Sequence, residues 1–405
     1  MSEKERILQV SPIHPFPARM APSIVWDNLP NYGRPMKILD PMAGSGTSLV
    51  IAKALGHRAI GCDTDPLAIL LASAWCSGVS SDILLRHANL VLGNAVNLAK
   101  KLTLKNAYPT YADNETKQFI DFWFDDKNRI QLTALANSIS KISNTSEKNL
   151  LWTAFSRMII TKKIGVSLAM DVSHSRPHRK YEIAPVSPFE RFLDAVEYLV
   201  KKAPFRDIDP KVNPAIVVKG DARALSFKSK SIDMVITSPP YLNALDYIRG
   251  HKLSLVWMGY PIKTLRTVRS TNIGVERSLL SYSTQEFAKV IRQTIDLDNL
   301  TSRYHGMLIR YLTDMSNVLK ECSRVLKDNG QAIFVVGNST IQGTYINNSE
   351  MLISLAEKRG LKLLSKSSRA LPESRRYLPP PNSDRAGQQL QNRMREEAIL
   401  QFVVA

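Results

Sequence analysis

Short apolar runs alternate with stretches of helical periodicity over much of the chain. An apolar run at 36–40 enters a loop of small residues, residues 48–56 have helical spacing, and 57–63 form a second apolar run. Gly56 stands where the helical spacing ends, and glycine is common at that position of a helix. The pattern predicts one strand–helix–strand unit over 36–66.

A second series of the same kind begins near residue 214. Strands that alternate with helices favour an α/β fold with a mostly parallel sheet. We expect strands at 215–221, 231–241, 330–339, 361–367 and 398–405, and helices at 306–328 and 348–359.

The residues between the two series, 75–213, have a different pattern. Four stretches with helical periodicity follow one another there. We therefore predict a mainly helical insertion at 75–213, between two halves of the α/β domain at 1–74 and 214–405. A smaller insertion is expected at about 260–300, where polar and basic residues interrupt the alternation.

Composition adds a charge imbalance to this picture. The 405 residues include 54 Lys and Arg against 36 Asp and Glu, which gives a formal net charge of +18. A hydrophobic content of 44% is that of a globular protein and excludes a disordered basic tail. The excess positive charge favours a polyanionic partner, and nucleic acid is the leading candidate.

The cysteines and the apolar runs bear on the cellular compartment. Cys62, Cys76 and Cys322 lie far apart and form no CxxC pair, which argues against a disulfide framework and a zinc ribbon. The charged start MSEKERILQV has no apolar signal core, and no apolar run reaches about 18 residues. We expect a soluble, cytoplasmic protein with no membrane partner.

The loop DPMAGSGT at 40–47 connects the first predicted strand to its helix. Gly44 and Gly46 permit tight backbone conformations and a close approach of the backbone to a ligand. Asp63 ends the next strand 19 residues after Gly44, where an acceptor for ribose hydroxyls is expected. Leu49 stands where the dinucleotide fingerprint needs a third glycine, so pyrophosphate binding is not favoured.

A second motif, TSPPY at 237–241, follows an apolar run and therefore lies at the carboxyl end of a predicted strand. Pro239 and Pro240 fix a rigid turn that lacks two backbone donors. Ser238 offers a hydroxyl acceptor, and Tyr241 offers a flat face on which a base can stack. A plain loop is the alternative for this motif alone, but its occurrence in one sheet with the glycine loop favours a catalytic role.

These motifs resemble those of the S-adenosylmethionine-dependent DNA amino-methyltransferases. DPMAGSGT is similar to that family's DPFAGSGT motif, with Met42 in place of phenylalanine, and HPFPARMAP at 14–22 is similar to its FPAK segment, with Arg19 in place of lysine. The resemblance implies a Rossmann-like class I methyltransferase fold with a mostly parallel seven-stranded sheet. It also implies that S-adenosylmethionine is bound by Phe16, Pro17, Ala18, Asp40, Pro41, Gly44, Ser45, Gly46, Thr47 and Asp63.

The resemblance further implies a base and a contact for the cofactor's adenine. SPPY is typical of the family's N4-cytosine enzymes and DPPY of its N6-adenine enzymes, so Ser238 favours cytosine N4, with adenine N6 as the alternative. Asp221 occupies the place that contacts the adenine ring of the cofactor, and Asn94 is a rival for that role.

The residue types of TSPPY suit methylation of an amino group. An exocyclic amino nitrogen is a poor nucleophile because its lone pair is delocalised into the ring. Hydrogen bonds from it to the Ser238 hydroxyl and the Pro239 carbonyl would localise the lone pair for direct attack on the sulfonium methyl. The target base must leave the duplex stack, and Tyr241 can clamp it. A C5-cytosine enzyme would need a cysteine nucleophile, which the positions of the three cysteines disfavour.

Positive charge concentrates in three stretches: 162–180, 249–277 and the proline-rich segment 368–385. Any one of these basic stretches is more simply interpreted as a solvated face of the protein. Because they lie beside the motifs or within insertions, we expect at least one of the three stretches to contact phosphates. His174 and His178 have the spacing of metal ligands, but no further ligand is evident, so we expect no metal. The candidate DNA contacts are His174, Arg176, Arg179, Arg249, Lys252, Arg266, Arg269 and Arg376.

The sequence thus predicts a site-specific methyltransferase acting on double-stranded DNA. The order of the motifs resembles the subclass whose recognition domain lies between its two halves, which makes 75–213 the candidate recognition region. An RNA amino-methyltransferase and an inactive nucleic-acid-binding relative are the less favoured alternatives. No endonuclease motif stands out, and a separate restriction endonuclease or defence partner remains open.

Overall fold

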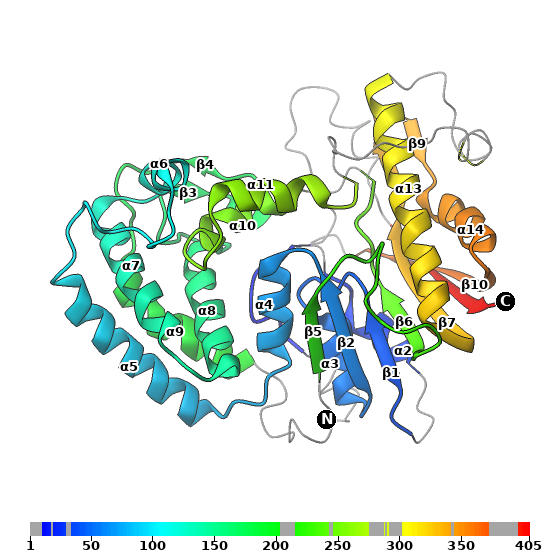
Figure 1. The fold of residues 1–405 in the computed structure, drawn as a ribbon, viewed down its shortest axis with the longest axis horizontal. Coiled ribbons are helices and arrows are strands. Elements are labelled where there is room, and N and C mark those ends of the chain that lie inside the picture. The colour runs from blue at the N-terminus through cyan, green and yellow to red at the C-terminus, as the bar shows by residue number, and fades with distance from the viewer. Residues whose placement is uncertain are drawn as a thin grey trace. The chain divides into compact units, whose positions relative to one another are not determined.

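Seven strands form one sheet in this computed structural model, in the order β10–β11–β7–β6–β1–β2–β5 (Figure 1). β1 pairs with β6, β6 with β7 and β2 with β5 in parallel, whereas β11 runs antiparallel to both β7 and β10. The predicted α/β class with a mostly parallel sheet is confirmed. The strands are β1 (Lys37–Asp40), β2 (Arg58–Asp63), β5 (Ala215–Lys219), β6 (Ile232–Thr237), β7 (Leu326–Gly337), β10 (Leu361–Ala370) and β11 (Glu396–Val404).

The structure describes residues 10–17, 19–29, 34–202, 215–242, 246–274, 287, 290, 302–341, 344–371 and 396–405. Contacts divide the chain into two compact units. The first unit comprises Met1–Pro35, Ala43–Lys219 and Leu245–Arg269. The second comprises Met36–Met42, Gly220–Ala244 and Ser270–Ala405.

The strand–helix–strand motif predicted at 36–66 has nearly the predicted bounds in β1, α3 and β2. The helix α3 (Thr47–Ala54) begins directly after Gly46, whose left-handed conformation ends the loop. The next helix, α4 (Pro66–Trp75), begins with proline at its first position and is capped by the Asp65 carboxylate, which accepts a hydrogen bond from the backbone N–H of Leu67.

The second series of strands and helices is confirmed in its order, with several boundaries shifted by up to four residues. The helix α13 (Ser302–Val325) ends three residues before its predicted end, because Leu326 already pairs with Ile232 in the sheet. Both side chains are buried there, so the strand conformation removes both from water. α14 (Asn348–Lys358) matches its prediction, and Figure 1 shows α13 and α14 beside β7.

The region between β2 and β5 is mainly helical. α5 packs against α7 and α9, and α8 packs against α4 and α9 (Figure 1). Asp113, Asp125 and Asn144 cap three of these helices through their side-chain oxygens, which satisfies amide groups that have no partner within the helix. The helices are α5 (Ser81–Ala99), α6 (Asn114–Trp123), α7 (Asp126–Ser140), α8 (Thr145–Ile159) and α9 (Pro188–Lys202).

Several short helices and strands lie outside the seven-stranded sheet. Part of the predicted insertion at 260–300 forms α11, and most of the remainder lies outside the described residues. Within the described part of the chain, no helix is long and apolar enough to cross a membrane. The short elements are α2 (Pro22–Asn28), β3 (Ala169–Met170), η1 (Val172–His174), β4 (His178–Arg179), α10 (Ile248–Leu255), α11 (Ile262–Thr271), β8 (Ser339–Ile341) and β9 (Thr344–Ile346).

Candidate functional site

The glycine loop is held in a conformation that its two glycines alone adopt easily. Gly44 has a φ of 51° and Gly46 a φ of 89°, both in the left-handed region. The Gly46 N–H donates to the Ala43 carbonyl at 2.8 Å. A Cβ on Gly46 would lie 2.9 Å from the backbone Cα of Ala72, so a larger residue there meets α4 as well as backbone strain.

The Asp63 carboxylate fixes this loop from the end of β2. Its Oδ2 accepts from the Gly44 N–H at 2.9 Å, and its Oδ1 accepts from the Asp65 N–H at 2.9 Å. The Ala43 N–H donates to the Cys62 carbonyl at 3.0 Å and adds a second tie between loop and strand. A carboxylate offers about four acceptor positions, and these two hydrogen bonds use two of them. The predicted contact between Asp63 and a ribose is therefore compatible with the structure.

Phe16 lies against the glycine loop. A Cβ on Gly44 would stand 3.5 Å from the Phe16 ring, which also packs on His251 and Tyr247 with ring centroids 5.1 Å and 5.9 Å apart. Pro17 is buried beside it, and Ala18 lies outside the described residues. The FPAR segment and the glycine loop, separated in sequence, are thus brought together in the first unit.

The helical region anchors the segment that carries Phe16. His14 Nε2 lies 3.0 Å from the Ser156 hydroxyl of α8, and Tyr198 of α9 donates its phenol to the Pro12 carbonyl at 3.4 Å. Burial lowers the pKa of His14 well below its usual value, and the nearby charges of His251 and Arg157 lower it further. His14 is therefore held as the neutral imidazole.

A buried histidine–aspartate pair was missed by the sequence analysis. His251 Nδ1 lies 2.6 Å from Asp65 Oδ2, while Asp65 Oδ1 caps α4. The Asp-Pro pair at 65–66 is a typical start of a helix, but nothing in the sequence connects it to a histidine 186 residues away. Because His251 also packs on Phe16, this pair supports the wall of the glycine loop.

In the second unit, one hydrogen bond joins the starts of the two motifs. Asp40 ends β1 and begins DPMAGSGT, and Thr237 ends β6 and begins TSPPY. The Thr237 hydroxyl donates to Asp40 Oδ1 at 2.7 Å, and both side chains are buried. The Met42 N–H donates to the same oxygen at 3.1 Å, and Pro41 between them is buried. The parallel pairing of Leu39 with Val235 puts both strand ends at one edge.

The TSPPY turn is partly accessible to solvent. Ser238, Pro240 and Tyr241 are half-buried, whereas Pro239 is buried. The Tyr241 phenol donates to Glu397 Oε1 at 3.2 Å, so β11 fixes the far end of the tyrosine side chain. Glu397 is a second residue that the sequence analysis did not identify, because 156 residues separate it from Tyr241.

Asp221 belongs to an ion-pair network in the second unit. Its carboxylate accepts from Arg223 Nε and Nη2 at 2.9 Å and 2.7 Å, and Arg223 also donates to Asp314 of α13 at 2.8 Å. Burial opposes ionisation of Asp221, but the hydrogen bonds and charge of Arg223 outweigh it and hold the pKa of Asp221 below its usual value. The predicted adenine contact stays a prediction. The rival Asn94 lies on the exposed face of α5.

The predicted DNA contacts fall into three groups. Arg249, Lys252, Arg266 and Arg269 line one cavity with aromatic residues of α6, and Arg179 lies over the ring of one of these, Phe122. His174 and Arg176 are exposed in the turn around η1. Arg376 lies outside the described residues.

Asp171 lies near both histidines of this turn, 3.6 Å from His174 Nδ1 and 3.7 Å from His178 Nδ1. Across the ranges that the structure describes, no group of three or more His, Cys, Asp or Glu side chains is arranged to hold a metal ion.

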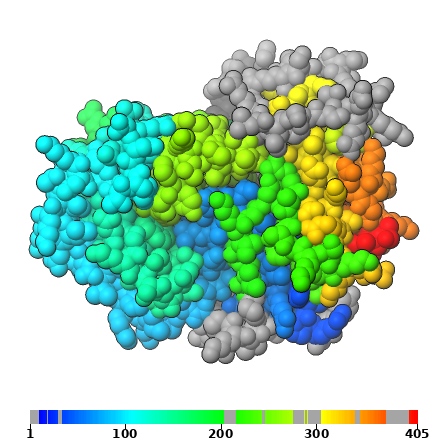
Figure 2. Space-filling view, in the orientation of Figure 1, coloured from blue at the N-terminus to red at the C-terminus, as the bar shows by residue number. Residues whose placement is uncertain are grey.

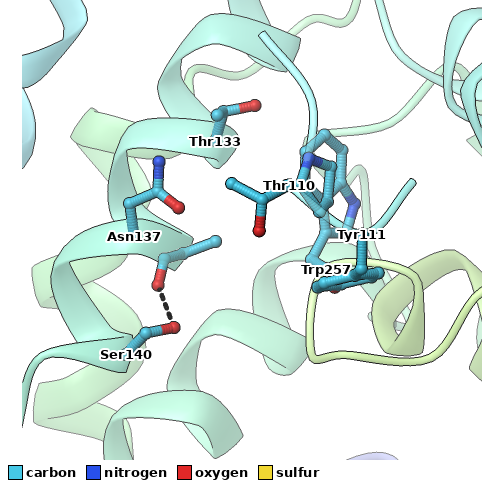
Figure 3. A pocket seen from close by; sticks show the side chains of 8 residues that line it. Thr110, Tyr111, Thr133, Asn137, Ser140 and Trp257 are labelled. Atoms are coloured by element: carbon cyan, nitrogen blue, oxygen red, sulfur yellow. Dashed lines mark hydrogen bonds between the residues drawn. The ribbon is translucent and has the colours of Figure 1, made fainter. Parts of the chain in front are cut away.

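A smaller cavity, of about 160 Å³, lies between α7 and the segment 109–111. Figure 3 shows Thr133, Asn137 and Ser140 of α7 facing Thr110, Tyr111 and Trp257. Tyr111 accepts from the Gly259 N–H and donates to the Val256 carbonyl at 2.9 Å. None of the described residues that line this cavity is charged. The hydrogen bonds of Tyr111 connect the segment after α10 to the helical region.

The chain is similar in sequence to Type II methyltransferases. No family model matches the chain. The Type II methyltransferase M.MvaI of Kocuria varians is 24% identical over 396 residues, covering 91% of this chain and 85% of that protein. The Type II methyltransferase M.BsoBI of Geobacillus stearothermophilus is 22% identical, covering 80% of this chain and 73% of that protein.

Among solved structures, a Thermus thermophilus protein described as a DNA modification methylase, complexed with S-adenosyl-L-methionine, is 17% identical. The match covers 45% of this chain and 51% of that chain, with a TM-score of 0.24. The similarity in sequence to Type II methyltransferases extends over most of the chain.

Proposed function

We propose that this chain is an S-adenosylmethionine-dependent, site-specific DNA methyltransferase that methylates the exocyclic N4 amino group of cytosine in a base flipped out of the duplex. The Type II methyltransferases with similar sequences support methylation of DNA. The choice of cytosine N4 depends on Ser238 in TSPPY and on the resemblance of that motif to N4-cytosine enzymes.

The hydrogen bond between Thr237 and Asp40 is the observation that carries the proposal. It joins the first residue of the catalytic motif to the first residue of the cofactor motif through buried side chains 2.7 Å apart. The carboxyl ends of neighbouring parallel strands are where open α/β sheets bind their ligands. Methyl transfer requires the motif that binds the methyl donor and the motif that binds the target base to lie at the same edge of the sheet.

The glycine loop fits S-adenosylmethionine. Gly44 and Gly46 give the loop its left-handed turns, and Asp63 ends β2 where an acceptor for the ribose is expected. The buried hydroxyl of Thr47 has no hydrogen-bond partner within the described residues, so it is available to a polar ligand. Phe16 supplies an apolar wall on the side of Gly44. When bound, S-adenosylmethionine supplies an electrophilic methyl group on its sulfonium.

The TSPPY turn then acts on the target base. The Ser238 hydroxyl and the Pro239 carbonyl accept hydrogen bonds from its amino group, which localises the nitrogen lone pair toward the methyl group. Tyr241 stacks on the flipped base, and Glu397 holds the phenol of Tyr241 in place. No covalent bond between enzyme and base is needed, and the excess amino proton leaves after transfer.

Product analysis tests the proposal. The purified protein is incubated with S-adenosylmethionine and unmethylated genomic DNA, and the nucleosides are separated by mass spectrometry. N4-methylcytosine is the expected product. N6-methyladenine would overturn the base assignment, and methylated RNA with unmethylated DNA would overturn the substrate.

Two variants test the residues of the motif. Ser238→Ala is expected to lower turnover by about 100-fold or more, because a preorganised hydrogen bond to the reacting group is lost. Tyr241→Ala should do the same, whereas Tyr241→Phe keeps the stacking ring. Cofactor affinity, measured by calorimetry, should persist in all three. Ser368→Ala, on the exposed face of β10, is the matched control. Full activity of Ser238→Ala and Tyr241→Ala would show that TSPPY is not catalytic.

A further inference from the structure

A cavity of about 390 Å³ opens between α6, α10 and α11 within the first unit, and we name it the α6–α11 cavity. Its volume lies within the range of about 300–1,000 Å³ that is usual for ligand pockets. In Figure 2 the cyan atoms of α6 meet the yellow-green atoms of α11 on the face shown. Its lining comprises Glu115, Gln118, Phe119, Phe122, Trp123, Ile248, Arg249, Lys252, Ile262, Leu265, Arg266 and Arg269.

Two ion pairs and a backbone contact hold the walls of the cavity. Glu115 of α6 pairs with Arg266 of α11, and the Ile262 N–H donates to the Thr116 hydroxyl at 3.0 Å. Arg269 pairs with Asp246 at 2.6 Å. These contacts neutralise two of the four cations and define the shape of the pocket.

The remaining charge makes the cavity attractive to an anion. Arg249 is exposed and has no carboxylate partner within the described residues. Burial lowers the pKa of Lys252, and Arg269, Arg249 and Arg266 lower it further, with Asp246 opposing them. With Arg266 and Arg269 paired, Arg249 and Lys252 leave the cavity lining with an excess of positive charge, which a phosphate would neutralise.

The opposite wall is aromatic. Phe119, Phe122 and Trp123 of α6 form a cluster in which Phe122 and Trp123 meet edge to face, with ring centroids 4.8 Å apart. Phe122 is 49% exposed although it is a large apolar residue. The Lys252 ammonium lies 5.3 Å from the centroid of the Phe119 ring, so the aromatic and cationic walls are adjacent. Exposed rings beside unpaired cations are the usual features of sites that bind unstacked nucleotides.

We propose that the α6–α11 cavity binds one unstacked nucleotide of the nucleic-acid substrate, with its base on the aromatic wall and its phosphate on Arg249 and Lys252. The inference rests on the proposed function, since it assumes a DNA substrate. It goes further by assigning a nucleotide pocket none of whose residues belongs to TSPPY or to the glycine loop. Phe119, Phe122 and Trp123 become recognition residues that the charge pattern alone did not identify.

Binding of two labelled oligonucleotides tests the proposal. One probe is a single-stranded dT 12-mer, and the other is a 12-mer of abasic nucleotides that keeps the phosphates and lacks the bases. Affinities are measured by fluorescence anisotropy at several NaCl concentrations with the full chain. The wild-type protein should bind the dT 12-mer about tenfold more tightly than the abasic 12-mer. This ratio corresponds to a difference of about 1.4 kcal/mol in binding free energy.

Variants separate the base contact from the phosphate contact. Phe122→Leu should weaken dT binding about tenfold, leave the salt dependence unchanged and leave binding of the abasic probe unchanged. Phe122→Tyr, which keeps the ring, should bind as the wild type does. Arg249→Gln should weaken both probes and reduce the magnitude of the salt slope by about 0.7, as the loss of one phosphate contact to a single strand does. Arg191→Gln on α9 and Tyr345→Leu on β9 are controls for exposed residues outside the cavity.

The outcomes also separate this inference from the proposed function. If Arg249→Gln weakens binding and Phe122→Leu does not, the cavity contacts backbone phosphate only and the base contact is wrong. Unchanged binding in both variants overturns the whole inference, even if the protein methylates DNA. Conversely, the proposed function alone would be wrong if the wild-type protein transfers no methyl group to DNA while its binding of the dT probe still depends on Phe122. In methyl-transfer assays at varied DNA concentration, Phe122→Leu should raise the KM for DNA and keep kcat within about twofold.

Discussion

The two glycines of the loop and the α6–α11 cavity belong to the same unit, but the two sites are formed in different ways. The loop is fixed by backbone hydrogen bonds and by a carboxylate 19 residues away, so its geometry follows from a short stretch of sequence. The cavity needs α6 to pack against α10 and α11, and Arg266 is 151 residues from its partner Glu115. The first kind of site is visible as a motif, whereas the second depends on packing between distant helices.

The substitution of glycine by alanine should have opposite effects in the glycine loop and in the helix α5 of the same unit. Gly46→Ala places a Cβ at a φ of 89° and 2.9 Å from the Ala72 backbone. We expect the free energy of unfolding to fall by about 3 kcal/mol, from left-handed strain and overpacking together. Gly93→Ala in the exposed part of α5 meets no atom within 4 Å and should raise that free energy by about 0.5–1 kcal/mol. Urea denaturation measures both.

An unchanged stability of Gly46→Ala would mean that the loop does not require the left-handed conformation. In that case the comparison between a backbone-determined site and a packing-determined site would lose its basis.

The second prediction concerns the carboxylate that fixes the loop. Asp63→Asn removes the charge that accepts from the Gly44 and Asp65 N–H groups, and it replaces one oxygen by a donor. We expect S-adenosylmethionine to bind about 10- to 100-fold more weakly, since hydrogen bonds to a charged group contribute about 1.5–3 kcal/mol. Calorimetry measures the affinity, and Asp328→Asn at the exposed Lys230–Asp328 pair is the control. An unchanged affinity would count against Asp63 as a cofactor residue.

The same contrast explains how much the sequence could predict. The order of strands and helices was predictable because runs such as 36–40 and 330–339 are centred on consecutive apolar residues and are bounded by turn residues. The shift at Leu326 was not, because its strand conformation comes from pairing with Ile232 in a different part of the chain. Periodicity extends a helix for as long as apolar residues recur, and only tertiary pairing ends it there.

The candidate site shows the same limit. Asp40, Gly44, Gly46 and Asp63 could be identified because each stands at a fixed offset within one supersecondary unit. His251 could not be connected to Asp65, because the pair forms only when α10 packs in the first unit. The arginines of 249–277 were identified by their charge, but the aromatic wall opposite them was not, since a helix with three aromatic residues has no signal that separates a core from a pocket.

The smallest predicted effect concerns His14, which connects the wall of the glycine loop to the helical region. This residue precedes Phe16 and attaches the segment to α8 through Ser156, so the helical region holds the wall of the glycine loop. Burial, together with the charges of His251 and Arg157, lowers the pKa of His14 in the folded protein well below 6.5. Below pH 6.5 the unfolded chain therefore binds a proton that the folded chain does not, and stability falls as the pH falls. Above that pH this histidine contributes no pH dependence.

The expected slope from His14 is at most about 1.4 kcal/mol per pH unit, the value for one proton. His14→Gln keeps a group that can hydrogen-bond to Ser156 and removes the titration, so its unfolding free energy should depend less on pH between 6.5 and the pH of acid unfolding. His174→Gln, the same change in the exposed turn, is the control. Urea denaturation at several pH values measures the slopes. If His14→Gln and the wild type lose stability in parallel, His14 is not the group whose neutral form anchors the Phe16 segment, and the dependence of the loop wall on the helical region must come from other contacts.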